Sequence, residues 1–391
     1  MVKKIVIAGG GIGGFAAALA CAREGAEPEL FERAPEFTEV GAGVQLGPNV
    51  VKILYGWGLK AALDSVAAFP ERLQVRSAPS GAELGVLRLG DVALARYGAP
   101  YVTIHRADLH GLLLAAVKLL PGVSLNLSQA VRQFEDHAQG VTVTMASGRT
   151  VAGDLLVGAD GGWSSVRQQL LNDGVPQPTG HLAYRAMVRQ SDLPAHLRSQ
   201  QVTAWLGPKL HVVQYPVRGG EWLNVVAIVH GRIEGALEDW DHSANAGELR
   251  ALLANTCAPL LDLVHAIDAW RLWGLSIRNP LRGAFEMAQG RVALLGDAAH
   301  PMVPYLAQGA GMAIEDAQAL AQMLALDSGD VPTRLAQYAQ ARWARNARVQ
   351  ARAIRNGRVF HATGLVRVGR DAAMKLLGER LLDVPWLYGG A

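Results

Sequence analysis

Short apolar runs separated by glycine-rich turns make up most of the hydrophobic pattern of this chain. Residues 4–8 form one such run, which is typical of a buried parallel strand. Five glycines follow within residues 9–14, and an alanine-rich segment that ends at Arg23 predicts a helix. Residues 29–32 predict a second strand. From 184 to 273 the apolar runs are short and alternating, which predicts an antiparallel sheet.

The first strand, turn, helix and second strand together form a nucleotide-binding motif. Gly9, Gly11 and Gly14 fit the pattern G-x-G-x-x-G, and Glu32 ends the second strand. The first glycine permits the tight turn, the second lets a pyrophosphate approach the backbone, and the third lets the helix pack close to the strand. The helix N-terminus holds the anion and the acid binds a ribose. The motif predicts a dinucleotide cofactor, and by itself it leaves NAD and FAD open.

Two later segments each place a carboxylate at the end of an apolar strand. Asp160 follows the run at 154–158, and Asp297 follows the run at 291–295. A carboxylate in this position can bind the hydroxyls of a sugar alcohol. A Gly-Ala-Gly sequence at 309–311 then opens a predicted helix, whose first N–H groups can face an electron-rich carbonyl or ring nitrogen.

Composition excludes several classes of protein. The 391 residues are 50% hydrophobic and 18% charged, which excludes a disordered chain and a charged coiled coil. A net charge of +3 argues against a dedicated nucleic-acid-binding protein. No run of 18 apolar residues occurs, so we expect no membrane span, and the glycines at 9–14 would break a signal-peptide helix. The two cysteines, Cys21 and Cys257, predict free thiols in the reducing cytoplasm, and no metal-binding motif is present.

In this order, the three segments resemble the single-component FAD-dependent aromatic hydroxylases, the flavoprotein monooxygenases of the salicylate and hydroxybenzoate hydroxylase type. Further matching pieces are the loop at 41–49, the helix start at 105–109 and the strand at 211–218. The resemblance covers nearly the whole chain. It implies an α/β fold in which a Rossmann-like FAD-binding domain carries an inserted antiparallel β-sheet substrate domain and C-terminal helices.

The resemblance also divides the chain into parts and implies which residues hold FAD. We expect the FAD-binding domain in residues 1–75, 100–175 and 280–331, the substrate-binding sheet in 76–99 and 176–279, and a helical segment in 332–391. The residues expected to bind the cofactor are Gly9, Gly11, Gly14, Glu32, Arg33, Arg106, Asp160, Asp297, Gly309, Ala310 and Gly311.

The catalytic candidates lie on a predicted strand of the middle sheet. His211 and Tyr215 are four residues apart, so both side chains point to one face of that strand. The spacing alone favours two side chains of the sheet core, whereas the resemblance implies that they remove the proton from a substrate phenol. Gln45 and Pro304 are candidates for the substrate pocket, and we interpret His300 as structural.

Six arginines between Arg342 and Arg358 recur every three or four residues. This spacing predicts a basic stripe on one helix face, which we interpret as a solvated face with acidic neighbours. The alternatives are a binding surface for the NAD(P)H phosphates and a dimer contact.

The resemblance implies a monooxygenase that uses NADH or NADPH and O₂ to hydroxylate a small phenolic or N-heteroaromatic acid through a flavin C4a-hydroperoxide. Two alternatives stay open: an FAD-dependent reductase or dehydrogenase without oxygen transfer, and a non-enzymatic flavin-binding redox sensor. The expected partners are the aromatic substrate, O₂ and NAD(P)H, without nucleic acid or membrane, and the protein is expected to be a monomer or homodimer.

Overall fold

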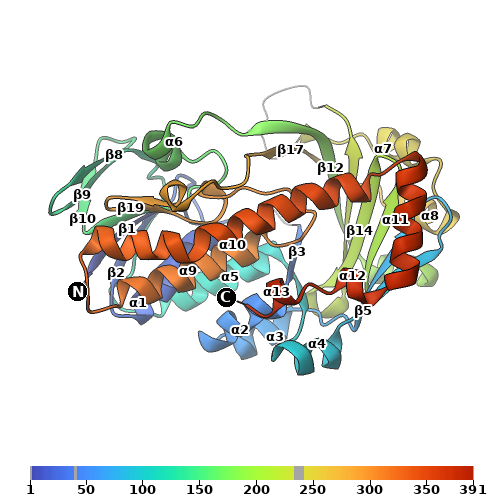
Figure 1. Ribbon diagram of the computed structural model, residues 1–391, viewed down its shortest axis with the longest axis horizontal. Coiled ribbons are helices and arrows are strands. Elements are labelled where there is room, and N and C mark those ends of the chain that lie inside the picture. The colour runs from blue at the N-terminus through green and yellow to red at the C-terminus, as the bar shows by residue number, and fades with distance from the viewer. Residues whose placement is uncertain (1, 39–41, 233–241, 391) are drawn as a thin grey trace.

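The computed structural model describes residues 2–38, 42–232 and 242–390, so Gly41 of the loop at 41–49 lies outside the described residues. The described strands form four sheets, and helices pack against them (Figure 1). The α/β class predicted from the sequence is confirmed.

The N-terminal motif builds a six-stranded sheet with the order β18-β19-β11-β1-β2-β7. Its pairs are parallel except for β18 and β19. The four residues of β1 after Lys4 are all buried, as expected of a strand inside a parallel sheet. The strands are β1 (Lys4–Ala8), β2 (Glu27–Phe31), β7 (Ser124–Asn126), β11 (Leu155–Gly158), β18 (Ala288–Gln289) and β19 (Val292–Leu294).

Helix α1 (Ile12–Arg23) joins β1 to β2 and is buried over most of its length. Its alanines at 16–18 are fully buried, and such small side chains let neighbouring helices approach closely. Both α5 (Arg106–Lys118) and α9 (Gly309–Leu324) contact α1. This packing fixes the end of α1 that follows the glycine turn.

The middle of the chain forms an eight-stranded sheet with the order β16-β17-β12-β15-β14-β13-β4-β5. As predicted, its pairs are antiparallel, with the exception of the parallel pair β4 and β13. The strands are β4 (Arg72–Ser77), β5 (Glu83–Arg88), β12 (Gln177–Arg189), β13 (Val202–Gly207), β14 (Leu210–Val217), β15 (Trp222–His230), β16 (His242–Ser243) and β17 (Arg271–Ile277).

The two faces of this sheet have different neighbours. Val212 and Val225 belong to a core that includes leucines of α7 (Ala246–Leu253) and α8 (Ala258–His265). Because side chains alternate along a strand, His211, Val213 and Tyr215 point to the opposite face of β14. The helices α7 and α8 do not cover that face, so it is available to line a pocket.

Smaller elements lie outside the two large sheets. A three-stranded sheet has the order β10-β9-β8, and a two-stranded sheet pairs β3 with β6. The bounds are β3 (Gly43–Leu46), β6 (Val102–His105), β8 (Val131–His137), β9 (Gly140–Met145), β10 (Thr150–Gly153), α2 (Pro48–Gly56), α3 (Lys60–Val66), α4 (Gly90–Tyr97) and α6 (Ser165–Leu171).

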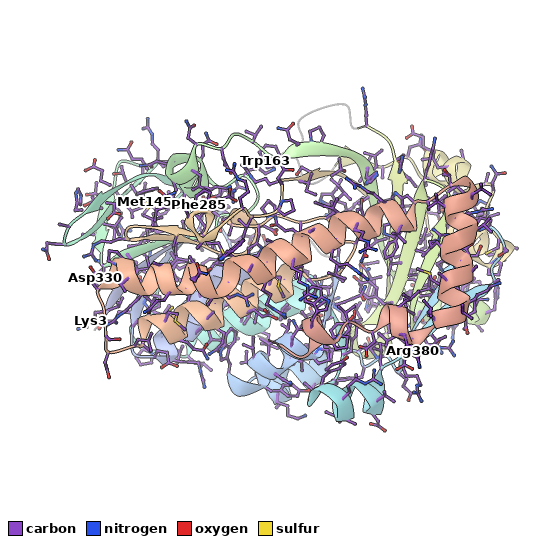
Figure 2. The ribbon with its side chains drawn as sticks, viewed as in Figure 1. Lys3, Met145, Trp163, Phe285, Asp330 and Arg380 are labelled. Carbon is purple, nitrogen blue, oxygen red and sulfur yellow. The ribbon has the colours of Figure 1, made fainter. Side chains whose placement is uncertain are left out.

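The C-terminal segment is helical and begins with the long helix α10 (Val331–Phe360). Asp330, labelled in Figure 2, caps it by accepting a 3.0 Å hydrogen bond from the backbone N–H of Thr333. In Figure 1, α10 runs from the six-stranded sheet to the eight-stranded sheet, where α11 lies across its end. The remaining helices are α11 (Gly364–Leu377), α12 (Glu379–Leu382) and α13 (Pro385–Tyr388).

The predicted solvated face of α10 is wrong for the first part of the helix. Arg342 is 1% exposed, and its guanidinium lies 2.8 Å from Asp316 and 2.9 Å from Glu315, both on α9. Arg345 binds the same Glu315 at 2.7 Å. The reason is that α10 packs on α9, so these arginines lie between two helices; Arg358, near the end of α10, is exposed.

Within the described ranges, no helix is both long enough and apolar enough to cross a bilayer.

Candidate active site

The turn between β1 and α1 is shaped by two glycines. Gly9 has a φ of +103°, and a Cβ there would lie 2.4 Å from the carbonyl oxygen of Ala159. A Cβ on Gly14 would lie 1.9 Å from the carbonyl oxygen of Gly9. Gly11 is the N-cap residue of α1, and because glycine has no side chain, nothing at this position covers the first N–H groups of the helix. The turn is thus built for close contact between strand, helix and an anion.

Glu32 closes this turn from the end of β2. One carboxylate oxygen accepts a 2.7 Å hydrogen bond from the N–H of Gly10, and the other accepts one of 2.8 Å from the N–H of Ala34. The carboxylate of Glu32 therefore stabilises the glycine turn. It also lies at the position where a ribose is expected. Arg33 next to it is exposed.

A cleft of about 520 Å³ lies along this turn. Its lining brings together six of the residues expected to bind the cofactor, namely Gly9, Gly11, Glu32, Arg33, Arg106 and Asp160. Two buried donors on its wall, Nε of Arg185 and Nε1 of Trp273, have no hydrogen-bond partner among the described residues. A long cofactor with phosphates and ring carbonyls supplies the acceptors that this wall lacks, so the residues present fit FAD.

Asp160 lines the cleft, but its carboxylate also has a structural role. It accepts hydrogen bonds from the backbone N–H groups of Ser165, at 2.8 Å, and Val166, at 3.2 Å. These groups begin α6, so Asp160 holds the start of that helix beside the cleft. Burial raises its pKa above the usual value, and the hydrogen bonds from Ser164 and the helix oppose that rise.

The second strand-end carboxylate, Asp297, is exposed and lies on a single turn after β19 whose other two residues are buried. It lines neither the cleft nor the pocket described below, and nor does the start of α9 at Gly309, Ala310 and Gly311. His300 is fully buried and its Nε2 lies 2.5 Å from a carboxylate oxygen of Asp316, which fits the structural role expected for it.

A pocket of about 530 Å³ lies against the free face of β14. Gln45, Pro304 and His211 line it, so three of the four residues expected around a substrate share one cavity. Tyr215 is 4% exposed and lies beyond this lining, further along the same strand face. Tyr101, which no sequence motif indicates, also lines the pocket and donates a 2.6 Å hydrogen bond to Gln45.

Tyr215 lies between the pocket and the cleft. Its phenol interacts through a hydrogen bond with Gln45, a pocket residue. It also interacts electrostatically with the guanidinium of Arg185, a cleft residue. Burial raises the pKa of Tyr215 well above its usual range, although Arg185 and Gln45 both oppose this. Sequence reasoning missed Arg185, although a charged residue inside the apolar strand β12 was the available signal.

His211 begins a chain of hydrogen-bonded histidine rings. Its Nδ1 lies 2.7 Å from Nε2 of His361, and Nδ1 of His361 lies 3.1 Å from Nε2 of His230, whose ring is exposed. Burial and the neighbouring His181 lower the pKa of His211 to about 3. Burial, His211 and other nearby charges lower the pKa of His361 to about 2. Both rings are therefore neutral at physiological pH.

Comparison with known proteins agrees with this geometry. Residues 3–355 match the FAD binding domain family. The chain is 37% identical to a 3-hydroxybenzoate 6-hydroxylase of Klebsiella oxytoca, over 99% of this chain and 97% of that protein. It is also 37% identical to a 3-amino-4-hydroxybenzoate 2-monooxygenase of Streptomyces platensis, over 99% and 96% of the two chains.

The structure is similar to a salicylate hydroxylase substrate complex, with a TM-score of 0.83, 28% identity and coverage of 99% and 95%. The expectation of an FAD-dependent enzyme with this fold is confirmed. The chain belongs to the family of FAD-dependent aromatic hydroxylases.

Proposed function

We propose that this enzyme hydroxylates a small hydroxybenzoate or hydroxypyridine carboxylate with NADH or NADPH, and that His211 receives the phenolic proton of the substrate. The observation that carries the proposal is the position of a neutral histidine in the wall of the pocket, with its Nδ1 already bonded to His361. The relatives named for 3-hydroxybenzoate and 3-amino-4-hydroxybenzoate support this class of substrate.

The environment of His211 explains how it could serve as a base that does not keep its proton. A neutral ring can accept a proton through Nε2, which makes no hydrogen bond to another described residue. Burial disfavours the charged ring, so the proton is passed on rather than retained. The rings of His361 and His230 then lead from the pocket to solvent.

Tyr215 has a different role in this proposal. Its raised pKa keeps the phenol protonated at neutral pH, so it does not act as a base. Through Gln45 it can fix the position of a pocket side chain, while Arg185 links it to the cofactor cleft. We therefore propose a positioning role for Tyr215 and a catalytic role for His211.

FAD, when bound, supplies the reduction of O₂ and the transfer of one oxygen atom to the ring. The backbone of the glycine turn, Glu32 and Arg106 would hold its ADP half and pyrophosphate in the cleft. The apolar wall of the pocket excludes water from the reacting ring. The free thiols of Cys21 and Cys257 support a place in the reducing cytoplasm, and we propose a monomer or a homodimer.

The test is the ratio of hydroxylated product to NAD(P)H consumed, measured with a panel of hydroxybenzoates and hydroxypyridine carboxylates. In His211→Ala we expect FAD to stay bound and its reduction to continue, while oxygen transfer falls by about 10²–10⁴-fold and H₂O₂ replaces product. Tyr215→Phe should lower the ratio less, because only a hydrogen bond is removed.

An unchanged ratio of product to NAD(P)H in His211→Ala would show that His211 is a side chain of the sheet core without a catalytic role. Oxidation of NAD(P)H without any hydroxylated product from the wild-type enzyme would instead favour a reductase.

A further inference from the structure

The charged side chains that line the pocket all carry a positive charge. Apolar side chains such as Val75, Leu206, Val213 and Met374 form most of its wall. Three arginines also line it, and the described residues around it include no aspartate or glutamate. An apolar cavity that holds only positive formal charge favours an anionic ligand with an apolar body.

The three arginines differ in what they already bind. Arg370 of α11 is held by Asp371 at 2.7 Å and by the carbonyl oxygen of Phe360, also at 2.7 Å. Arg352 and Arg355 of α10 form no hydrogen bond or ion pair with any residue that the structure describes. Nε of Arg352 is fully buried without a partner.

Arg352 and Arg355 are three residues apart on α10, so their side chains share one face of the helix, and both reach the same pocket as His211. Burial, and then the charges of Arg355 and Arg348, lower the pKa of Arg352 below its usual value. A guanidinium in this setting gains from a carboxylate, whose two oxygens match its planar donors.

We propose that Arg352, assisted by Arg355, binds the carboxylate of the aromatic acid and thereby selects anionic substrates. The inference rests on the proposed function, because it takes the substrate to be an aromatic acid. The pocket volume of about 530 Å³ suits a single ring with its substituents. The phosphates of NAD(P)H are the other source of anionic groups, and the experiment separates the two.

The test compares an acid with its neutral isostere. Holoenzyme is titrated with 3-hydroxybenzoate and with 3-hydroxybenzamide, and binding is followed by the change in flavin absorbance. In Arg352→Gln we expect the Kd for the acid to rise by about 10–100-fold, because a charge-assisted pair is lost. The Kd for the amide should change by less than about threefold, and Arg355→Gln should show the same selectivity with a smaller effect.

Arg358→Gln is the matched control, because Arg358 is exposed on the same helix and does not line the pocket. Equal weakening of acid and amide in Arg352→Gln, or no weakening of either, overturns the proposal. A raised KM for NAD(P)H with unchanged binding of the acid overturns it too, since the arginines would then serve the dinucleotide.

Binding is measured without turnover, so a failure of hydroxylation is seen separately from a failure of this inference. If the wild-type holoenzyme binds no member of the hydroxybenzoate panel, the assignment of Arg352 to a substrate carboxylate is rejected together with the proposed substrate class.

Discussion

A single methyl group is enough to block the turn that begins the cofactor cleft. The Cα of Gly14 faces the carbonyl oxygen of Gly9 so closely that a Cβ would lie 1.9 Å from it. The contact partner is backbone, which cannot rotate away as a flexible side chain would. At this residue the requirement for glycine comes from the strand-to-helix contact and not from the cofactor itself.

Gly14→Ala should therefore destabilise the protein by roughly 1–3 kcal/mol through overpacking and should lower its FAD content. The free energy of unfolding in urea and the ratio of flavin to protein absorbance measure the two effects. Gly111→Ala in α5 is the control, because a Cβ there meets nothing within 4 Å. It should raise stability by about 0.5–1 kcal/mol, since alanine is the better helix former. Equal stability of the two variants would contradict this account of the turn.

The residues of the turn were predictable because the motif is local, whereas the other cavity residues were not. Gly9, Gly14 and Glu32 lie within one strand-helix-strand unit, and the pattern names them directly. His361 reaches His211 from 150 positions away in the chain, through the packing of α10 against the sheet. No local pattern records such a contact, so the chain of histidines is visible only in the fold.

At the scale of elements, buried ion pairs join α9 to α10. Asp316 and Glu315 lie on the buried face of α9, and Arg342 enters between the helices to bind both. Burial would raise the pKa of Asp316, but His300, Arg342 and Asn346 together lower it below its usual range. The sequence predicted the spacing of the arginines correctly but the exposure of Arg342 and Arg345 wrongly, because periodicity indicates which residues share a helix face and not what covers that face.

Removing the charge of Arg342 leaves the fully buried carboxylate of Asp316 without its guanidinium partner, whereas Glu315 keeps its ion pair with Arg345. Arg342→Met should therefore cost about 3–5 kcal/mol of unfolding free energy, the range found when one member of a buried ion pair is removed. Urea unfolding at neutral pH measures the loss. Arg358→Gln, on the exposed end of the same helix, should change stability by no more than about 0.5 kcal/mol. A loss in Arg342→Met no larger than this would show that the pair adds nothing to the interface.

At the scale of the whole molecule, the strands and helices predicted best are those in which the apolar pattern and a breaking residue coincide. The run at residues 4–8 is β1 with the same bounds, and the predicted helix ends at Arg23. The cavities depend instead on how the two large sheets and α10 meet, which involves residues from many separate segments. Their lining therefore follows from assembly of the whole chain, not from any one element.

The buried histidines make the stability of the whole fold sensitive to mild acid. Burial lowers the pKa values of His211 and His361 to about 3 and about 2. The unfolded chain binds protons at these rings below about pH 6.5, and the folded chain does not. Stability is therefore complete above about pH 6.5 and falls as the pH is lowered, by about 1.4 kcal/mol per pH unit for each proton. Carboxylates with lowered pKa values, such as Asp316, add to the loss only below about pH 4.

His361→Asn should make this pH dependence shallower, because an amide can take part in hydrogen bonds with both neighbouring rings and is not protonated. We expect the slope of unfolding free energy against pH between pH 5 and 6.5 to fall by most of one proton's share, at most about 1.4 kcal/mol per pH unit. Urea unfolding at half-unit steps of pH gives the slope for each protein. His265→Asn, at an exposed ring, is the control and should keep the wild-type slope. If the slope of His361→Asn also stays parallel to that of the wild type, the buried histidine chain is not the source of the acid sensitivity. A shallower slope in this variant alone would show that the rings linking the pocket to solvent also govern the stability of the fold.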